Sequence, residues 1–161
     1  MGGSDRRRHG VSIWIVLRRG DSLGPPASRP LSRALRGLRT MTKIARPADI
    51  NPAFAQAFNR RDVAALLSLY EPDAALHPHD AAQPLQGHAA LRAAFEQLIL
   101  APGHMVSRNA SCMVCGDIAL LSAEWTISDP PGTVLARGSS AEVARQQPDG
   151  SWLYVIDRAL A

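Results

Sequence analysis

The chain has 161 residues, of which 46% are hydrophobic and 20% charged, which is enough for one domain with an apolar core and too few for two. Its net charge of +4 is unevenly spread, because residues 1–40 hold nine basic and two acidic residues, whereas residues 41–161 hold nine basic and twelve acidic ones. The second part lacks the basic stripe of a nucleic-acid-binding domain, so we expect no nucleic-acid partner.

The first 46 residues are rich in Arg, Pro and Gly, and we expect them to form a disordered tail ahead of a folded domain at 47–161. The apolar run Val11–Leu17 is too short to span a membrane, and two arginines follow it where a signal peptide has small residues. We therefore expect a cytoplasmic protein that makes no membrane contact. The tail itself has two open explanations, an organellar transit peptide or an extension that is dispensable because translation starts at Met41.

Three helices are expected in the first half of the domain. Phe54 and Phe58 are four residues apart and would share one face of the first helix. Asp62 suits the N-cap of the second, whose apolar residues follow helical spacing. A short strand, Ala74–Pro78, and a loop separate it from the third. The predicted helical spans are Pro47–Asn59, Asp62–Tyr70 and His88–Leu100.

The second half of the domain is predicted to consist of strands joined by tight turns. Pro148-Asp149-Gly150 is typical of a hairpin loop, since proline fixes φ, aspartate caps its own turn and glycine takes the left-handed position. Helices followed by antiparallel strands indicate an α+β fold. The predicted strands are His104–Cys115, Ile118–Ser128, Thr133–Gln147 and Ser151–Leu160.

The hairpin at the C-terminal end supplies the main candidate for chemistry. If Gln147 pairs with Ser151, Glu142 lies opposite Ile156 and shares a sheet face with aromatic side chains and Arg158. Desolvation there would raise the pKa of Glu142 and make it a usable acid or base near neutral pH. The alternatives are that Glu142 pairs with Arg145 or Arg158, or is solvated at the rim.

Cys112 and Cys115 form the one C-x-x-C of the chain. They fall in a predicted strand, where residues three apart point to opposite faces, so we expect reduced, structural thiols and no redox pair. A single C-x-x-C is also only half of a zinc site. We therefore predict no metal.

Four short motifs occur in a characteristic order: Phe58-Asn-Arg-Arg-Asp62, Leu69-Tyr-Glu-Pro-Asp-Ala74, Gly87-His-Ala-Ala-Leu-Arg92 and Asp149-Gly-Ser-Trp152. Over residues 48–160 they resemble the nuclear transport factor 2-like superfamily, in particular its bacterial SnoaL-like and ketosteroid-isomerase-like branch. The resemblance implies a conical α+β barrel, in which a strongly curved, mostly antiparallel sheet wraps around three N-terminal helices. It also implies a pocket at the open end and a homodimer formed through the sheet.

The resemblance does not carry over the isomerase machinery. The base of a ketosteroid isomerase falls on Pro78, and its oxyanion-hole tyrosine falls on Phe54. Only its second donor, a protonated aspartate, has a counterpart, at or near Glu142. We therefore do not expect a classical ketosteroid isomerase.

Two functions are compatible with these residues. The first is a cofactor-independent isomerase, cyclase or dehydratase acting on a small hydrophobic molecule, and the second is a non-catalytic dimeric ligand-binding or scaffold protein. For the enzyme we predict Glu142 as the proton-transfer group, His77 or His79 as its assistant, and Tyr154 as the donor to a substrate oxygen. The predicted pocket residues are Phe54, Phe58, Trp125, Trp152 and Arg158.

Overall fold

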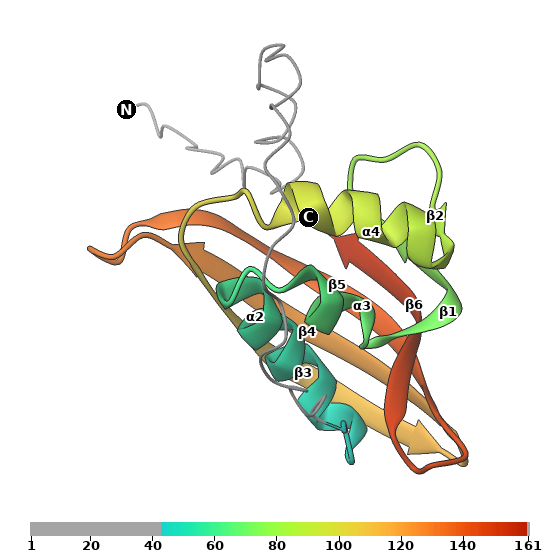
Figure 1. Cartoon of the computed structure of the whole chain (residues 1–161). Helices are drawn as coiled ribbons and strands as arrows, with labels where there is room; N and C mark the ends of the chain where they lie inside the picture. The colour runs from blue at the N-terminus through green and yellow to red at the C-terminus, as the bar shows by residue number, and fades with distance from the viewer. Residues whose placement is uncertain (1–42, 161) are drawn as a thin grey trace, which may run out of the picture.

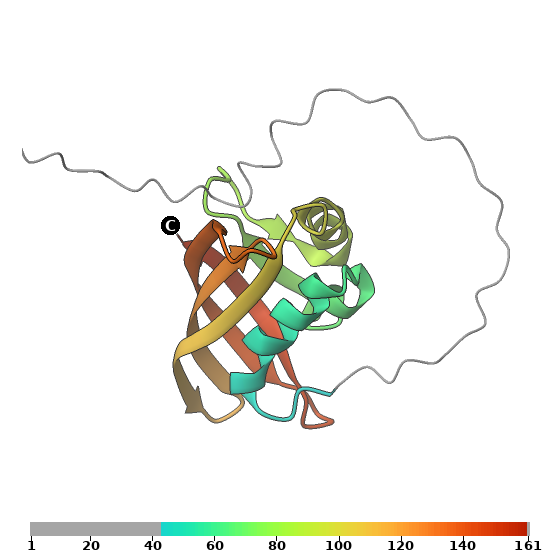
Figure 2. The same ribbon diagram turned by 90° about the vertical axis from the view of Figure 1, so that its left-hand side faces the viewer.

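The computed structural model describes residues 43–160, in which three α-helices lie on the concave face of a curved six-stranded sheet (Figure 1). Figure 2 shows the helices gathered on one side of the strands. This is the α+β cone expected from the sequence. The disordered tail was predicted for residues 1–46, of which residues 1–42 lie outside the described part of the chain. In chain order the helices are η2 (Pro47–Asp49), α2 (Ile50–Asn59), α3 (Val63–Leu67) and α4 (Gly87–Leu98).

The short helix α3 begins where the sequence predicts and ends earlier. The Asp62 side chain accepts a hydrogen bond from the backbone N–H of Ala65 at 3.0 Å, which confirms the N-cap. The prediction that this helix continues to Tyr70 was wrong. The carbonyl of Leu69 accepts from the N–H of Tyr154 at 2.7 Å, so the chain has already left the helix to pair with the last strand.

The sheet contains the four strands predicted in the second half of the domain and two more, β1 and β2, in its first half. Its order is β2-β1-β6-β5-β4-β3, with β1 parallel to β6 and every other neighbouring pair antiparallel. The strand expected at Ala74–Pro78 is longer, and β2 was not predicted. The strands are β1 (Tyr70–His77), β2 (Leu85–Gln86), β3 (His104–Cys115), β4 (Ile118–Ser128), β5 (Val134–Gln146) and β6 (Trp152–Leu160).

A β-bulge in β6 changes which residues face the helices. Near the turn the pairing follows the predicted register, with Ala144 opposite Tyr154, but the register shifts by one residue before Val143 pairs with Ile156. Glu142 therefore lies opposite Asp157 and not opposite Ile156. The prediction failed because Val155 is an extra residue on β6, and such a residue reverses the alternation of side chains beyond it.

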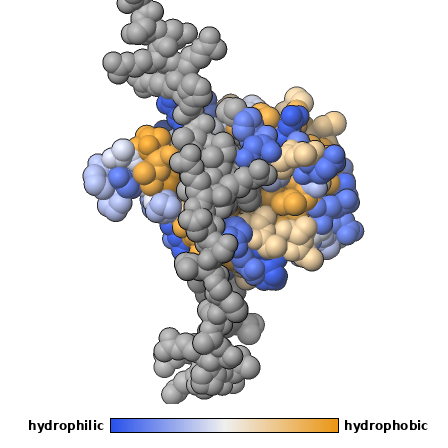
Figure 3. Space-filling view, turned by 90° about the horizontal axis from the view of Figure 1, so that it is seen from above, coloured by the Kyte–Doolittle hydropathy of each residue, from blue (hydrophilic) through white to orange (hydrophobic). Residues whose placement is uncertain are grey.

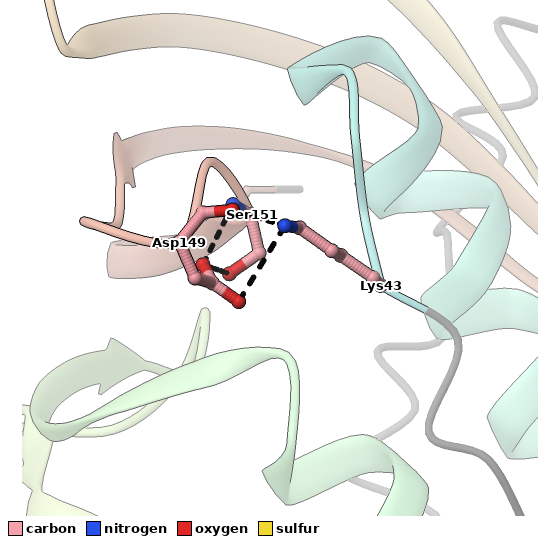
Figure 4. A network of polar contacts seen from close by, with 3 residues as sticks. All are labelled: Lys43, Asp149 and Ser151. Atoms are coloured by element: carbon pink, nitrogen blue, oxygen red, sulfur yellow. Dashed lines mark hydrogen bonds and ion pairs between the residues drawn. The ribbon is translucent and has the colours of Figure 1, made fainter.

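The turn between β5 and β6 has the predicted chemistry. Gly150 has a φ of 82°, and one carboxylate oxygen of Asp149 accepts from the N–H and the hydroxyl of Ser151 at 2.8 and 2.6 Å (Figure 4). Lys43 forms an ion pair with Asp149 at 3.7 Å. Ile44 is buried, and its carbonyl accepts from the N–H of Trp152. The packed chain thus begins before residue 47, where composition placed the boundary.

The outer face of the sheet carries an apolar row. Met113, Leu120, Val143 and Ile156 are successive cross-strand partners on β3, β4, β5 and β6, and three of them are among the exposed large hydrophobic residues. Exposed Val134 and Leu135 lie at the end of the β4–β5 hairpin, where apolar surface is visible from above (Figure 3). These residues leave apolar surface outside the core.

Candidate functional site

A cavity lies between the helices and the concave face of the sheet. It is partly open, and its volume of about 70 Å³ is several times the space that one buried water needs. Helices α2 and α4 and strands β1 and β3–β6 all contribute to its lining. The lining residues are Asn51, Phe54, Leu76, Phe95, Leu98, Met105, Ser107, Trp125, Ser140, Glu142, Tyr154, Asp157 and Ala159.

Asn51, in the first turn of α2, connects the polar groups at one end of the cavity. Its amide nitrogen donates to Oε2 of Glu142 at 3.2 Å and to Oδ1 of Asn109 at 2.9 Å. Its amide oxygen accepts from the hydroxyl of Tyr154 at 2.6 Å. Asn51 and Glu142 are only 5% and 2% exposed, and the bonds of Asn51 to Glu142 and Tyr154 are buried away from bulk water. The network fixes the orientation of the Glu142 carboxyl.

Glu142 meets a second carboxyl across the strands. Asp157 is its direct partner in the β5–β6 ladder, and both side chains line the cavity. Burial raises the pKa of Glu142, against the hydrogen bonds from Ser140 and Asn51, which favour the ionised form. Burial, helped by the charge of Glu142, raises the pKa of Asp157 to about 7, although the hydrogen bond from Tyr70 opposes the shift. The pair can therefore hold a proton near neutral pH.

Two buried tyrosines lie beside the carboxyl pair. The hydroxyl of Tyr70 donates to Oδ2 of Asp157 at 2.5 Å, and the rings of Tyr70 and Tyr154 lie 4.8 Å apart. Burial raises the pKa of both phenols well above the ordinary value, so both remain protonated donors. Each phenol proton is used within the protein.

Aromatic rings form much of the apolar wall. Phe54 contacts Phe95 edge to face, with ring centroids 5.9 Å apart. Trp125 on β4 lies opposite Gly138 on β5, and a Cβ built on Gly138 would come within 2.6 Å of the indole. The Trp125 ring can pack against β5 at this point because Gly138 has no side chain.

The sequence pattern of the SnoaL-like domain matches residues 52–154, which is more than half of the chain. The chain belongs to the SnoaL-like domain family. Among curated proteins, none matches it significantly.

Solved structures similar to this SnoaL-like domain share its nuclear transport factor 2-like fold. A proposed calcium/calmodulin-dependent protein kinase type II association domain from Thiobacillus denitrificans is 21% identical, with a TM-score of 0.64 over 73% of this chain and 96% of that one. A proposed NTF2-like dehydratase from Streptomyces avermitilis is 20% identical, with a TM-score of 0.58 over 69% and 89%. An NTF2-like protein of unknown function from Pseudomonas putida is 21% identical, with a TM-score of 0.58 over 70% and 82%. At these identities the similarity establishes the fold alone.

The SnoaL-like domain brings together only some of the predicted site residues. Glu142, Tyr154, Phe54 and Trp125 line the cavity. Phe58 and Trp152 are buried in the core without lining it. Their roles as pocket residues were inferred from face and spacing, which do not distinguish a cavity wall from the core behind it.

Three other predicted residues lie away from the cavity. The Nε2 of half-buried His77 lies 3.1 Å from the carbonyl oxygen of Ala81, and His79 is exposed. Arg158 is exposed because the bulge turns it to the outer face, so its assignment to the pocket was wrong. Arg145 forms an ion pair with Glu71 at 3.6 Å rather than with Glu142.

Two site residues of the SnoaL-like domain were missed. Asn51 was missed because nothing in the local sequence shows that its side chain points inward. Asp157 was assigned to the outer face, since strict alternation places it there. The run from Trp152 to Ile156 is apolar throughout, so the sequence pattern of β6 does not locate the bulge.

Residues 43–160 contain no group of three or more His, Cys, Asp or Glu side chains able to hold a metal ion. Within the same range, no helix is long and apolar enough to cross a membrane. Cys112 and Cys115 are both free and exposed.

Proposed function

We propose that this SnoaL-like domain is a cofactor-independent proton-transfer enzyme of the isomerase, cyclase or dehydratase type, acting on a small hydrophobic molecule in the cavity. The observation that supports it best is the pair of facing carboxyls, Glu142 and Asp157, in a cavity with apolar walls. Two carboxyls whose environments favour different protonation states can act as base and acid in one reaction. Cytoplasmic location remains part of this proposal.

In this mechanism the carboxylate of Glu142 accepts a proton from the carbon next to a carbonyl group. Asp157, in its protonated form, donates to the carbonyl oxygen, and the electron pair of the broken C–H bond forms an enol. Protonated Glu142 then gives its proton to another carbon of the enol, or to a neighbouring hydroxyl that leaves as water, while Asp157 takes back the enol proton and the carbonyl forms again, which gives isomerisation or dehydration. Tyr154 holds Asn51 in position, since its hydroxyl already donates to that amide.

A matched proton-exchange assay tests the proposal without knowledge of the natural substrate. Cyclohexanone in D₂O would be followed by proton NMR for loss of the hydrogens next to the carbonyl. The protein should accelerate exchange over buffer, and Glu142→Gln should abolish the acceleration while its unfolding midpoint stays within a few degrees of the parent. Ser139→Ala, on the outer face, is the control. Absence of acceleration by the parent protein would count against proton-transfer catalysis.

A second function has its own support. The phenol protons of Tyr70 and Tyr154 are both used by protein acceptors, and an apolar row lies exposed on the outer face of the sheet. A ligand-binding or scaffold protein that dimerises through this face would have these features. In that case Leu120→Lys should convert the protein from dimer to monomer in analytical ultracentrifugation, and cyclohexanone exchange should equal the buffer rate.

A further inference from the structure

The cavity carries negative charge that no residue of its lining compensates. Glu142 and Asp157 are the two ionisable carboxyls among the lining residues, and no Lys, Arg or His lines the cavity with them. The other titratable groups that face the pair are Tyr70 on β1 and Tyr154 on β6, which are neutral donors. A carboxylate with no countercharge in an apolar surrounding is unfavourable, and either a bound proton or a positively charged ligand relieves that cost.

Asp157 also has an unused acceptor. The hydrogen bond from Tyr70 goes to Oδ2, and among residues 43–160 Oδ1 has no hydrogen-bond partner. This carboxyl is only partly buried and lines the cavity, so a ligand can reach it. An ammonium group could thus donate to Oδ1 without displacing any protein contact.

The walls suit the rest of such a ligand. Phe54, Phe95 and Trp125 line the cavity beside the carboxyls, and aromatic faces attract cations as well as apolar groups. The ionisable carboxyls among the lining residues are both acidic, so the local field in the cavity favours a cation over an anion.

We propose that the cavity selects small hydrophobic amines, bound as ammonium ions, and rejects carboxylates of the same shape. The inference rests on the proposed function, whose substrate class it names. The ammonium ion pairs with Asp157 in its ionised form through Oδ1, while Glu142 keeps its hydrogen bond from Asn51. Binding near pH 7 therefore releases part of a proton, because the cation favours the ionised form of Asp157.

Three ligands that share a cyclohexane ring and differ in their head groups provide the test. Binding of cyclohexylammonium, cyclohexanol and cyclohexanecarboxylate would be measured at pH 7 by titration calorimetry, in two buffers of different ionisation enthalpy. The ammonium should bind at least tenfold more tightly than the alcohol, with buffer-dependent heat that reports proton release. The carboxylate should not bind measurably.

Two variants show whether the preference for the ammonium depends on the charge of Asp157 or only on the shape of the cavity. Asp157→Asn should remove at least tenfold of the preference for the ammonium over the alcohol, whereas Ser139→Ala should change neither that preference nor the affinity for the alcohol. A carboxylate that binds as well as the ammonium, or a preference that survives Asp157→Asn, would overturn the inference. If cyclohexanone exchange persists while the ammonium shows no preference, the substrate class is wrong and proton transfer stands. If exchange and all three ligands fail, both proposals are wrong.

Discussion

Asp157 lies directly opposite Glu142 across β5 and β6, with both carboxyls toward the cavity. The two groups thus titrate as a pair, since each affects the charge that the other can carry. Most of the expected solution behaviour of the domain follows from this relationship.

The first prediction concerns the electrostatic interaction between Glu142 and Asp157. Glu142→Gln keeps the shape of the side chain and removes its charge, so the pKa of Asp157 should fall below its value of about 7 in the parent protein. It should stay above that of an exposed aspartate, because burial is the largest cause of the shift. Carboxyl carbon NMR titration measures this directly. An unchanged Asp157 titration in the variant would show that the two carboxyls do not interact.

The pH dependence of stability gives a second prediction. The pKa of Asp157 is higher in the folded state than the ordinary 3.8, so the folded protein binds more protons between about pH 4 and 7. The free energy of unfolding should therefore decrease as pH rises through this window, by up to roughly 1.4 kcal/mol per pH unit for one group. Urea denaturation at pH 5 and 8 measures the change. Asp157→Asn should flatten it, and an equally steep dependence in that variant would contradict the assignment.

A third prediction concerns Asn51 as the centre of the buried network. Asn51→Leu removes the partners of the Tyr154 hydroxyl and of Glu142 and should reduce the free energy of unfolding by roughly 2–4 kcal/mol, because buried polar groups lose their hydrogen bonds. Tyr154→Phe breaks one of these bonds and should cost about 1 kcal/mol. Chemical denaturation of both variants makes the comparison. Equal losses would mean that Asn51 does not connect the two groups.

Gly138 provides a fourth prediction. A Cβ at this position would lie 2.6 Å from the indole of Trp125 and 3.0 Å from the carbonyl oxygen of Leu160, so Gly138→Ala should displace the ring or strain the strand. We expect a loss of roughly 1–3 kcal/mol in the free energy of unfolding and an altered tryptophan emission spectrum. Ser139→Ala, whose side chain lies on the other face, should leave the emission unchanged. An unaltered spectrum in Gly138→Ala would show that the indole does not depend on this glycine.

The fifth prediction tests the thiols. Cys112 pairs with Leu121 and Cys115 with Ile118 in a regular ladder, so the two side chains point to opposite faces of the sheet. Both should react with Ellman's reagent in the folded protein, and mild oxidation should give no intrachain disulfide by non-reducing mass spectrometry. Formation of that disulfide without unfolding would mean that β3 departs from this register.

The sequence carries most of the fold because its local signals agree with one another. Asp62 caps a helix, Gly150 allows the turn, and alternation locates the long strands of the second half. The exception is Tyr70, where helical spacing continues while tertiary pairing with β6 determines the structure. Local patterns cannot show a strand whose partner is more than eighty residues away in the chain.

The candidate site was less predictable than the fold. Glu142 could be found, because an acidic residue in an apolar strand stands out, and so could Tyr154. Asp157 could not, since a bulge depends on how two strands twist against each other and leaves little trace in composition. Asn51 faces inward only because α2 crosses the sheet at that point, which no spacing within the helix reveals.

The bulge at Val155 has a consequence for how homologous sequences should be compared. Without the bulge, strict pairing continued from Ala144 and Tyr154 would set Glu142 opposite Ile156 and turn Asp157 to the other face of the sheet. A gap of one position in an alignment of these strands therefore carries chemical information that residue identity does not. Relatives that share the acid pair have to be recognised by strand length as well as by the acids themselves.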